Sequence, residues 1–224
     1  MTKRYISIVI IYLICFLSPL IPGFAWLTGF FPRGQGYGVV MTAIFFLTLI
    51  IVLILLLPER YIRNGERAPA GVSLLWAVGG VLALFALQIL ASLINTFIFG
   101  EPSQSAHTQS VVQIARMSPL FLLAVAVIGP MLEEIVFRKI IYGSLKKKMG
   151  FILAASISSL IFAFGHLDFQ HLLIYFVIGF FLCYAYKKTG RIAVNMFMHA
   201  AMNATVVAIS LTLSSPSFIQ LTGH

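Results

Sequence analysis

The sequence has few charged residues. Only 9% of its 224 residues are Asp, Glu, Lys or Arg, whereas soluble domains carry roughly 25%. Hydrophobic residues make up 60% of the chain, in runs long enough to cross a bilayer, which takes about 20 residues. The shortage of charge excludes an ordinary soluble domain. It predicts an all-α, polytopic membrane protein with about seven transmembrane helices, because helices satisfy their own backbone hydrogen bonds in lipid.

Cysteine and acidic residues are also scarce. Cys15 and Cys183, the two cysteines, both lie in apolar runs, which argues against a disulfide framework or a cysteine-based zinc site. Six acidic residues stand against fifteen Lys and Arg, which gives a net charge of +9. The basic residues form short clusters between apolar runs, as in membrane proteins generally. The positive charge therefore does not indicate nucleic acid, and the expected partner is the lipid bilayer.

The apolar runs divide the chain into seven expected spans. Their approximate bounds are 5–20, 38–57, 72–99, 119–145, 151–167, 171–186 and 192–213. The largest polar stretch, 100–118, should include a short interfacial helix around 111–115. We expect residues 1–118 to hold three spans and this polar loop, residues 119–213 to form a core of four spans, and residues 214–224 to be a short tail.

The distribution of Lys and Arg predicts the orientation. With seven spans, all but three of the fifteen basic residues fall on one side of the membrane. Arg33 and Arg116 fall on the other side, and Arg138 lies inside a span. Because cytoplasmic loops are enriched in Lys and Arg, we expect a multi-pass protein of the cell membrane with a cytoplasmic N-terminus and an external C-terminus.

Charged residues inside an apolar run are the main functional signal. Glu133, Glu134 and Arg138 lie in the expected fourth span, where a lone charge costs at least ~2.5–3.5 kcal/mol. Glu134 and Arg138 are one helical turn apart, so they can form an ion pair that either supports a site or simply locks helices together. Glu133 points about 100° away, which leaves it free for another task. Pro130 should kink the helix just before them, because it has no amide hydrogen.

Further polar residues occur in the expected fifth and seventh spans. His166 ends the fifth span, with Phe162 one turn before it, and the seventh span carries Asn195, His199 and Asn203 at one-turn spacing. A lone histidine in an apolar helix is more often a packing residue than a ligand. Two histidines, asparagines and a carboxylate pair in one small membrane protein lower their cost in lipid by converging.

Such a cluster suits hydrolysis. A carboxylate can take a proton from water, and histidine or asparagine can donate hydrogen bonds to a developing oxyanion. Alternatively, Glu133, His166 and His199 could hold a divalent metal such as zinc with an open fourth position, so the cofactor is either such a metal or none. The helical His-Glu-x-x-His signature of zinc proteases is absent from the sequence. His107, His171 and His224 lie at turns or in polar segments and are interpreted as solvated residues.

These motifs together resemble a known family. Glu133-Glu134-x-x-x-Arg138, Phe162-x-x-x-His166 and His199-x-x-x-Asn203 follow one another along residues 119–213. This pattern is similar to that of the CAAX prenyl protease and bacteriocin-processing (CPBP, or Abi) family of intramembrane endopeptidases. Members of that family have been described both as metalloproteases and as metal-independent glutamate proteases.

The resemblance implies a role for each residue. Glu133 would activate the water with help from His166, while His199 and Asn203 would stabilise the oxyanion or help to hold the water. Supporting roles would fall to the remaining motif residues and to one neighbour on the seventh span: Glu134, Arg138, Phe162 and Asn195.

We therefore expect an intramembrane endopeptidase that acts on a membrane-associated peptide or protein. One alternative is a catalytically silent membrane scaffold or immunity protein that keeps the fold and binds another membrane protein. A second alternative is a proton-coupled transporter, in which buried carboxylates and histidines relay protons. The lack of recognisable inverted repeats in the sequence disfavours the transporter.

Overall fold

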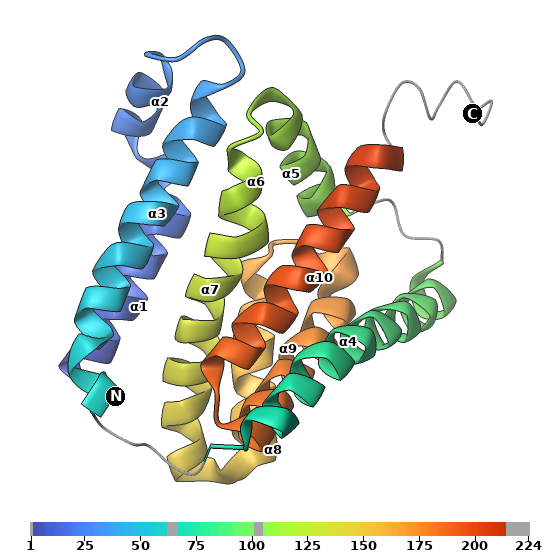
Figure 1. Cartoon of the computed structure of the whole chain (residues 1–224). Helices are drawn as coiled ribbons and strands as arrows, with labels where there is room; N and C mark the ends of the chain where they lie inside the picture. Colours follow the sequence, from blue (N-terminus) through green and yellow to red (C-terminus); the bar gives the residue numbers. More distant parts are fainter. Residues whose placement is uncertain (1, 62–66, 101–104, 214–224) are drawn as a thin grey trace.

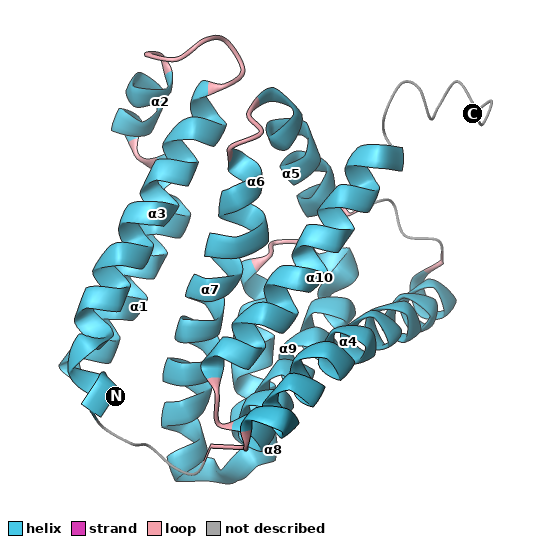
Figure 2. Ribbon diagram, in the orientation of Figure 1, coloured by secondary structure: helices cyan, strands magenta, loops and turns pink. Residues whose placement is uncertain are grey.

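The protein is described by a computed structural model that covers residues 2–61, 67–100 and 105–213. Within these residues every regular element is helical and no strand occurs (Figure 2), which confirms the predicted all-α class. The predicted tail, residues 214–224, lies outside the described residues, as does His224.

The N-terminal part forms a helical hairpin. Its elements are α1 (Lys3–Leu17), the 3-10 turn η1 (Ser18–Leu20), α2 (Pro22–Thr28), α3 (Gly36–Leu56) and the 3-10 turn η2 (Leu57–Tyr61). The sequence predicted no helix between the first two spans, yet α2 forms there. Pro22 occupies its first turn, where a missing amide hydrogen costs nothing and the fixed φ favours helix.

The next two helices differ in character. α4 (Ala70–Phe99) is long and apolar, and in Figure 1 its C-terminal end leans away from the rest of the bundle, where Phe97 and Phe99 are largely exposed. α5 (Ala106–Met117) is polar on one side and is longer than the interfacial helix expected around 111–115. It begins where the Ser105 side chain accepts a hydrogen bond from the Thr108 amide, which is a typical N-cap.

The segment that carries the carboxylates is a single helical column with two π-helical stretches. It consists of α6 (Phe121–Leu123), the π-helical η3 (Ala124–Ile128), α7 (Gly129–Glu133) and the π-helical η4 (Glu134–Tyr142). The Gly129 amide donates to the Ala124 carbonyl five residues earlier, and Pro130, which follows, has no amide to donate. The chain thus accommodates Pro130 by widening the preceding turn, and π-helical turns of this kind are frequent at functional sites.

Three helices complete the bundle. α8 (Gly143–Gly165) is interrupted at Gly150, whose φ of 76° breaks the helix beside the predicted start of the fifth span. The 3-10 turn η5 (Phe169–His171) leads into α9 (Leu172–Thr189), and α10 (Ile192–Leu213) follows. Buried Ser159 of α8 lies close to Gly179 of α9, where an added Cβ would approach the Ser159 Cβ to 3.1 Å. Small residues therefore let these two helices pack closely.

Two of the apolar cores adjoin the carboxylate column or the helices that pack on it. One joins α1 and α3 to α7 and η4, with Phe162 of α8 at its edge. The other joins α4, α9 and α10, with Leu182 and Met198 fully buried at its centre. The polar residues of the column are therefore surrounded by buried apolar side chains.

The bundle is that of a polytopic membrane protein. Among the described residues, five helical stretches are long and apolar enough to cross a membrane: Lys3–Leu20, Gly36–Glu59, Ala70–Phe99, Phe169–Thr189 and Ile192–Leu213. The column from α6 to η4 and the helix α8 are interrupted by π-helical turns and by Gly150, and they stand beside these stretches in Figure 1. This arrangement is compatible with the predicted number of about seven spans.

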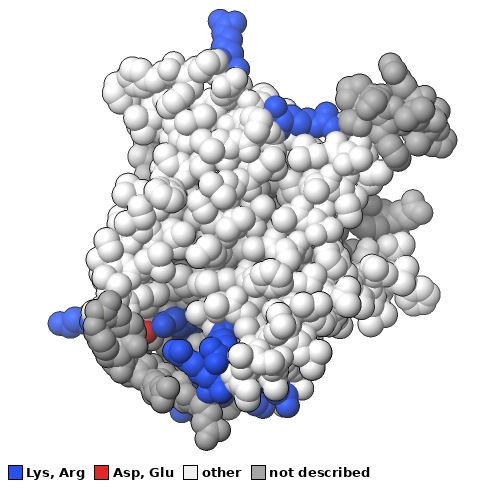
Figure 3. Space-filling view, in the orientation of Figure 1, with Lys and Arg blue, Asp and Glu red and all other residues white. Residues whose placement is uncertain are grey.

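Basic side chains gather at one end of the bundle. Figure 3 shows Lys and Arg clustered around the end where the chain starts, with a wide uncharged belt above it. At this end Glu59 of η2 accepts a hydrogen bond from the Tyr5 hydroxyl (3.2 Å) and pairs with Lys139 (2.9 Å). This link ties the N-terminal hairpin to the carboxylate column.

We expect the basic end to face the cytoplasm, because Lys and Arg are retained on that side. In a background with Cys15 and Cys183 replaced by alanine, a membrane-impermeant maleimide on intact cells should label an Arg33→Cys variant. A Lys187→Cys variant should be labelled only after permeabilisation. The opposite pattern would overturn the predicted orientation.

Candidate active site

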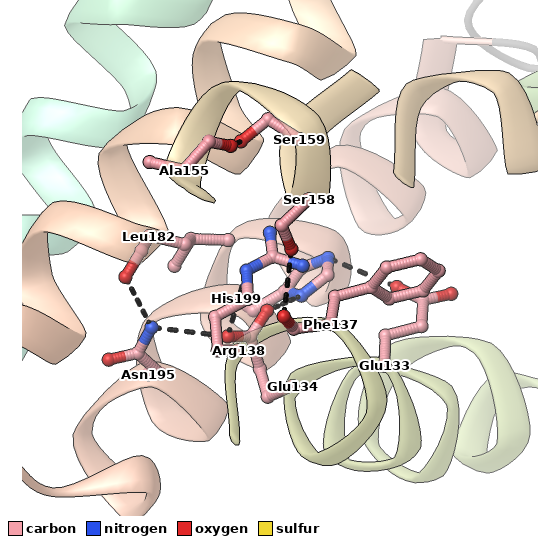
Figure 4. A network of polar contacts seen from close by, with 10 residues as sticks. All are labelled: Glu133, Glu134, Phe137, Arg138, Ala155, Ser158, Ser159, Leu182, Asn195 and His199. Carbon is pink, nitrogen blue, oxygen red and sulfur yellow. Dashed lines mark hydrogen bonds and ion pairs between the residues drawn. The ribbon is translucent and has the colours of Figure 1, made fainter. Parts of the chain in front are cut away.

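The polar residues of three helical segments meet in the middle of the bundle. Glu133 ends α7, Glu134 begins η4, His166 ends α8, and α10 supplies His199 and Asn203. Figure 4 shows the part of this network around Glu134, with side chains from the column and from α10 pointing toward one another. The five side chains come from elements far apart in the sequence, so the fold itself assembles them.

Glu134 is the fully buried centre of the network. It accepts hydrogen bonds from Asn195 Nδ2 (3.1 Å) and His199 Nδ1 (2.9 Å), and Arg138 Nε lies 3.3 Å from its carboxylate. The ion pair expected from the one-turn spacing is therefore present. Because a carboxylate only accepts hydrogen bonds, His199 Nδ1 must carry a proton, and this leaves Nε2 as the nitrogen that faces away from Glu134.

Arg138 is held by charge and by an aromatic ring. Its side chain is 1% exposed, and its Cζ lies 4.3 Å from the centre of the Phe162 ring, a distance suited to a cation–π interaction. No acceptor among the described residues meets hydrogen-bond geometry with its guanidinium. The same Phe162 ring contacts His199 edge-on, with centroids 5.8 Å apart. Phe162 thus connects the buried ion pair to the histidines.

Asn195 links three elements. Its amide donates to Glu134 and, at 2.7 Å, to the backbone carbonyl of Leu182 in α9. The residue lies one turn before His199 on α10, so one helix face supplies both donors to the Glu134 carboxylate. The supporting position that we expected for Asn195 therefore has a defined geometry.

Glu133 has a different environment from its neighbour. Its side chain is 22% exposed, and its Oε2 lies 3.6 Å from His199 Nε2, which is beyond a direct hydrogen bond. Both residues line an internal cavity of about 230 Å³, together with His166 and Asn203. Neither Glu134 nor Arg138 lines this cavity. Glu134 thus belongs to a buried network, whereas the adjacent Glu133 faces the cavity.

His166 and Asn203 are each fixed by a backbone carbonyl. His166 Nδ1 lies 2.9 Å from the Phe162 carbonyl. Because a carbonyl only accepts, Nδ1 must be protonated, and in the neutral ring Nε2 is then the acceptor. Asn203 Nδ2 donates to the Val125 carbonyl of η3 at 3.4 Å. This second bond ties α10 to the π-helical turn before Pro130.

The geometry does not support a metal site. The sequence left open a metal held by Glu133, His166 and His199. In the part of the chain that the structure describes, no three side chains of the types His, Cys, Asp or Glu are arranged to hold a metal ion. We therefore derive no chemical step through a metal.

Several residues of the cavity were not expected from the sequence. The N-terminal hairpin, which carries no polar signature, contributes part of the wall: Tyr12, Cys15, Phe16 and Phe45. The opposite part is lined by His107 of α5, by His171 and by Tyr175 of α9. The interpretation of His171 as a solvated residue was wrong, since its side chain is only 12% exposed and pairs with Asp168.

The sequence motifs did not include Asp168, although its position in the sequence gives a reason to single it out. It is one of only six acidic residues and lies two positions after His166. It is also largely buried, and an acidic residue so near a candidate site histidine merits attention wherever acids are scarce.

The fold and the site together define a class of protein: a polytopic helical membrane protein with glutamate, histidine and asparagine around an internal cavity. Residues 115–205, which include all of these side chains, match a family model described as Type II CAAX prenyl endopeptidase Rce1-like.

Two relatives are similar over nearly the whole chain. Membrane peptidase YdiL of Bacillus subtilis is 35% identical over 94% of this chain and 91% of its own length. Membrane-embedded CAAX protease MroQ of Staphylococcus aureus is 33% identical, with the same shares of the two chains covered. The chain belongs to the Rce1-like CAAX protease family, and this membership supports an intramembrane protease. No solved structure matches the chain.

We predict that an Arg138→Ala variant is strongly destabilised. It leaves the Glu134 carboxylate buried without its cation, which typically costs roughly 3–5 kcal/mol. The measurement is unfolding of the purified protein in detergent, with Arg33→Ala as the control, because Arg33 is exposed and surface substitutions usually change stability by less than about 0.5 kcal/mol. Equal stability of the two variants would contradict the importance of the ion pair.

Proposed function

We propose that the protein is an endopeptidase that hydrolyses a membrane-associated peptide or protein with a water molecule activated by Glu133. The observation that carries this proposal is the different placement of the two adjacent carboxylates. Glu134 is saturated by Asn195, His199 and Arg138, whereas Glu133 is partly exposed to the cavity. Only Glu133 is free to exchange a proton with a water molecule.

The cavity offers acceptors for such a water. Glu133 can take one of its protons, and the unprotonated Nε2 atoms of His166 and His199 can accept a hydrogen bond from the other. We place His199 in a water-holding role rather than an oxyanion-stabilising one, because its only proton in the neutral state is directed to Glu134. The water oxygen would then attack the peptide carbonyl carbon as its proton passes to Glu133.

The remaining steps use the same groups. The carbonyl oxygen becomes an oxyanion, and the second amide hydrogen of Asn203 is the donor available to it, since the first is bonded to the Val125 carbonyl. Glu133 would return its proton to the amide nitrogen as the carbon–nitrogen bond breaks, which leaves a carboxylic acid and an amine. Most of the cavity wall is apolar, and such surroundings strengthen electrostatic interactions between the polar groups.

We predict that Glu133→Gln keeps the fold and abolishes cleavage. Glutamine has nearly the same shape but cannot act as a base. The assay is incubation of wild type and variant, in liposomes, with a library of membrane peptides, followed by mass spectrometry of the products and by thermal unfolding of both proteins.

Cleavage by Glu133→Gln at the wild-type rate would disprove the role of Glu133. If wild type cleaves no peptide but conducts protons in liposomes, the transporter becomes the better interpretation. If wild type shows neither activity, a silent scaffold is favoured.

We predict that Asn203→Ala slows cleavage by about 10²–10³-fold, the loss found when one oxyanion donor is removed. Thr205→Ala is a matched control on the same helix, because Thr205 is exposed and its hydroxyl donates to the Ala201 carbonyl one turn earlier. The measurement is kcat for a peptide that wild type cleaves. A loss of similar size in both variants would point to damage to α10 rather than to a lost donor.

A further inference from the structure

The backbone is strained directly after His166. His166 is the C-cap residue of α8, and Leu167 after it adopts a φ of 53°. This left-handed conformation is unfavourable for a residue with a side chain, because its Cβ crowds the following carbonyl oxygen. The Leu167 side chain is largely exposed, so its own packing does not explain the conformation. The contacts of the residues on either side must hold the turn in place.

Asp168 is the anchor on the far side of this turn. Its buried carboxylate accepts hydrogen bonds from the Ser105 hydroxyl (2.6 Å) and from His171 Nδ1 (2.8 Å). Burial alone would raise the pKa of Asp168, but these two hydrogen bonds lower it below its ordinary value. The group is therefore ionised at neutral pH. We call Ser105, Asp168 and His171 the Asp168 cluster.

The Asp168 cluster reaches His166 through Tyr175. The Tyr175 hydroxyl lies 3.5 Å from the Ser105 hydroxyl, and its ring stacks on the His166 imidazole with centroids 4.0 Å apart and an interplanar angle of 24°. Two more rings contact the His166 imidazole edge-on: Phe162, with centroids 4.6 Å apart, and His107, with centroids 5.4 Å apart. The imidazole is thus enclosed by rings from α5, α8 and α9.

We infer that the Asp168 cluster and Tyr175 are positioning groups that hold the His166 ring with its Nε2 directed at the cavity. The contacts restrain different motions. The Phe162 carbonyl holds Nδ1, the Tyr175 ring blocks rotation of the imidazole out of its plane, and the cluster fixes the turn and the first turn of α9. The inference rests on the proposed function, because it assigns His166 to the water.

A purely structural role for these residues makes a different prediction. If the cluster only ties α5 to the turn, its loss lowers stability and leaves the state of the His166 ring unchanged. If it positions His166, its loss lets the ring rotate and populate the other tautomer. Catalysis then suffers in kcat rather than KM, since misplacement of a group by about 1 Å can cost 10²-fold in rate.

The first experiment compares two substitutions of Tyr175. Tyr175→Leu removes the stacked ring, and we expect kcat to fall by about 10²-fold with little change in KM. Tyr175→Phe keeps the ring, so its kcat should be at least about tenfold higher than that of Tyr175→Leu. Phe169→Leu is the matched control, because it removes a ring of the same turn whose recorded partner is Phe164. Equal kcat in the two Tyr175 variants would overturn the inference.

The second experiment does not depend on activity. Nitrogen-15 NMR of histidine-labelled protein in nanodiscs reports the protonation of each ring nitrogen, with the His166 signal assigned by a His166→Gln variant. Wild type should show a single His166 tautomer with the proton on Nδ1. Asp168→Ala and Tyr175→Leu should each show a mixture, and Asp168→Asn covers the case in which Asp168→Ala does not fold.

The two experiments separate the two proposals. Unchanged His166 signals in folded variants would refute the positioning role, even if wild type cleaves peptides. Changed signals in a protein that cleaves no peptide would support the positioning role and count against the proposed protease mechanism.

Discussion

The buried charge of Glu134 is the constraint on which the rest of the structure depends. A carboxylate with no exposure to solvent is stable only if it is paired and hydrogen-bonded. Arg138 supplies the opposite charge from the same column, and α10 supplies two donors, Asn195 and His199. Satisfying Glu134 therefore draws α10 against the column, and the bond from Asn195 to Leu182 brings α9 with them. The same contacts that assemble the bundle also fix the tautomer of His199.

The sequence allowed the main elements of this arrangement to be predicted, because they depend on local spacing. Apolar runs marked the spans, the one-turn separation marked the pair of Glu134 and Arg138, and helical spacing marked Asn195 beside His199. Glu133, His166, His199 and Asn203 were expected to converge, and they line one cavity; their catalytic roles stay proposals. The break at Gly150 lies next to the predicted boundary because glycine tolerates a positive φ.

Long-range contacts were beyond the reach of sequence patterns. Asp168 accepts a hydrogen bond from Ser105, which is 63 positions away. Neither residue belongs to a periodic run from which the other could be predicted as its partner. The cavity wall from α1 was equally hidden, because Tyr12 and Phe16 are ordinary members of an apolar span. Whether Glu133, His166 and His199 could hold a metal depended on distances between three helices, which no spacing within one helix determines.

The site thus combines two kinds of support. Most contacts that set Glu133, His166, His199 and Asn203 lie within residues 115–205, the part that matches the family model. Ser105 and His107, just before that part, add support around His166. The wall from α1 and α3 lies outside that part. A change of Phe16 or Phe45 alters the shape of the cavity without touching the Glu134 network, because neither side chain bonds to it. The polar groups of the site and part of its apolar wall are therefore supplied by different segments of the chain.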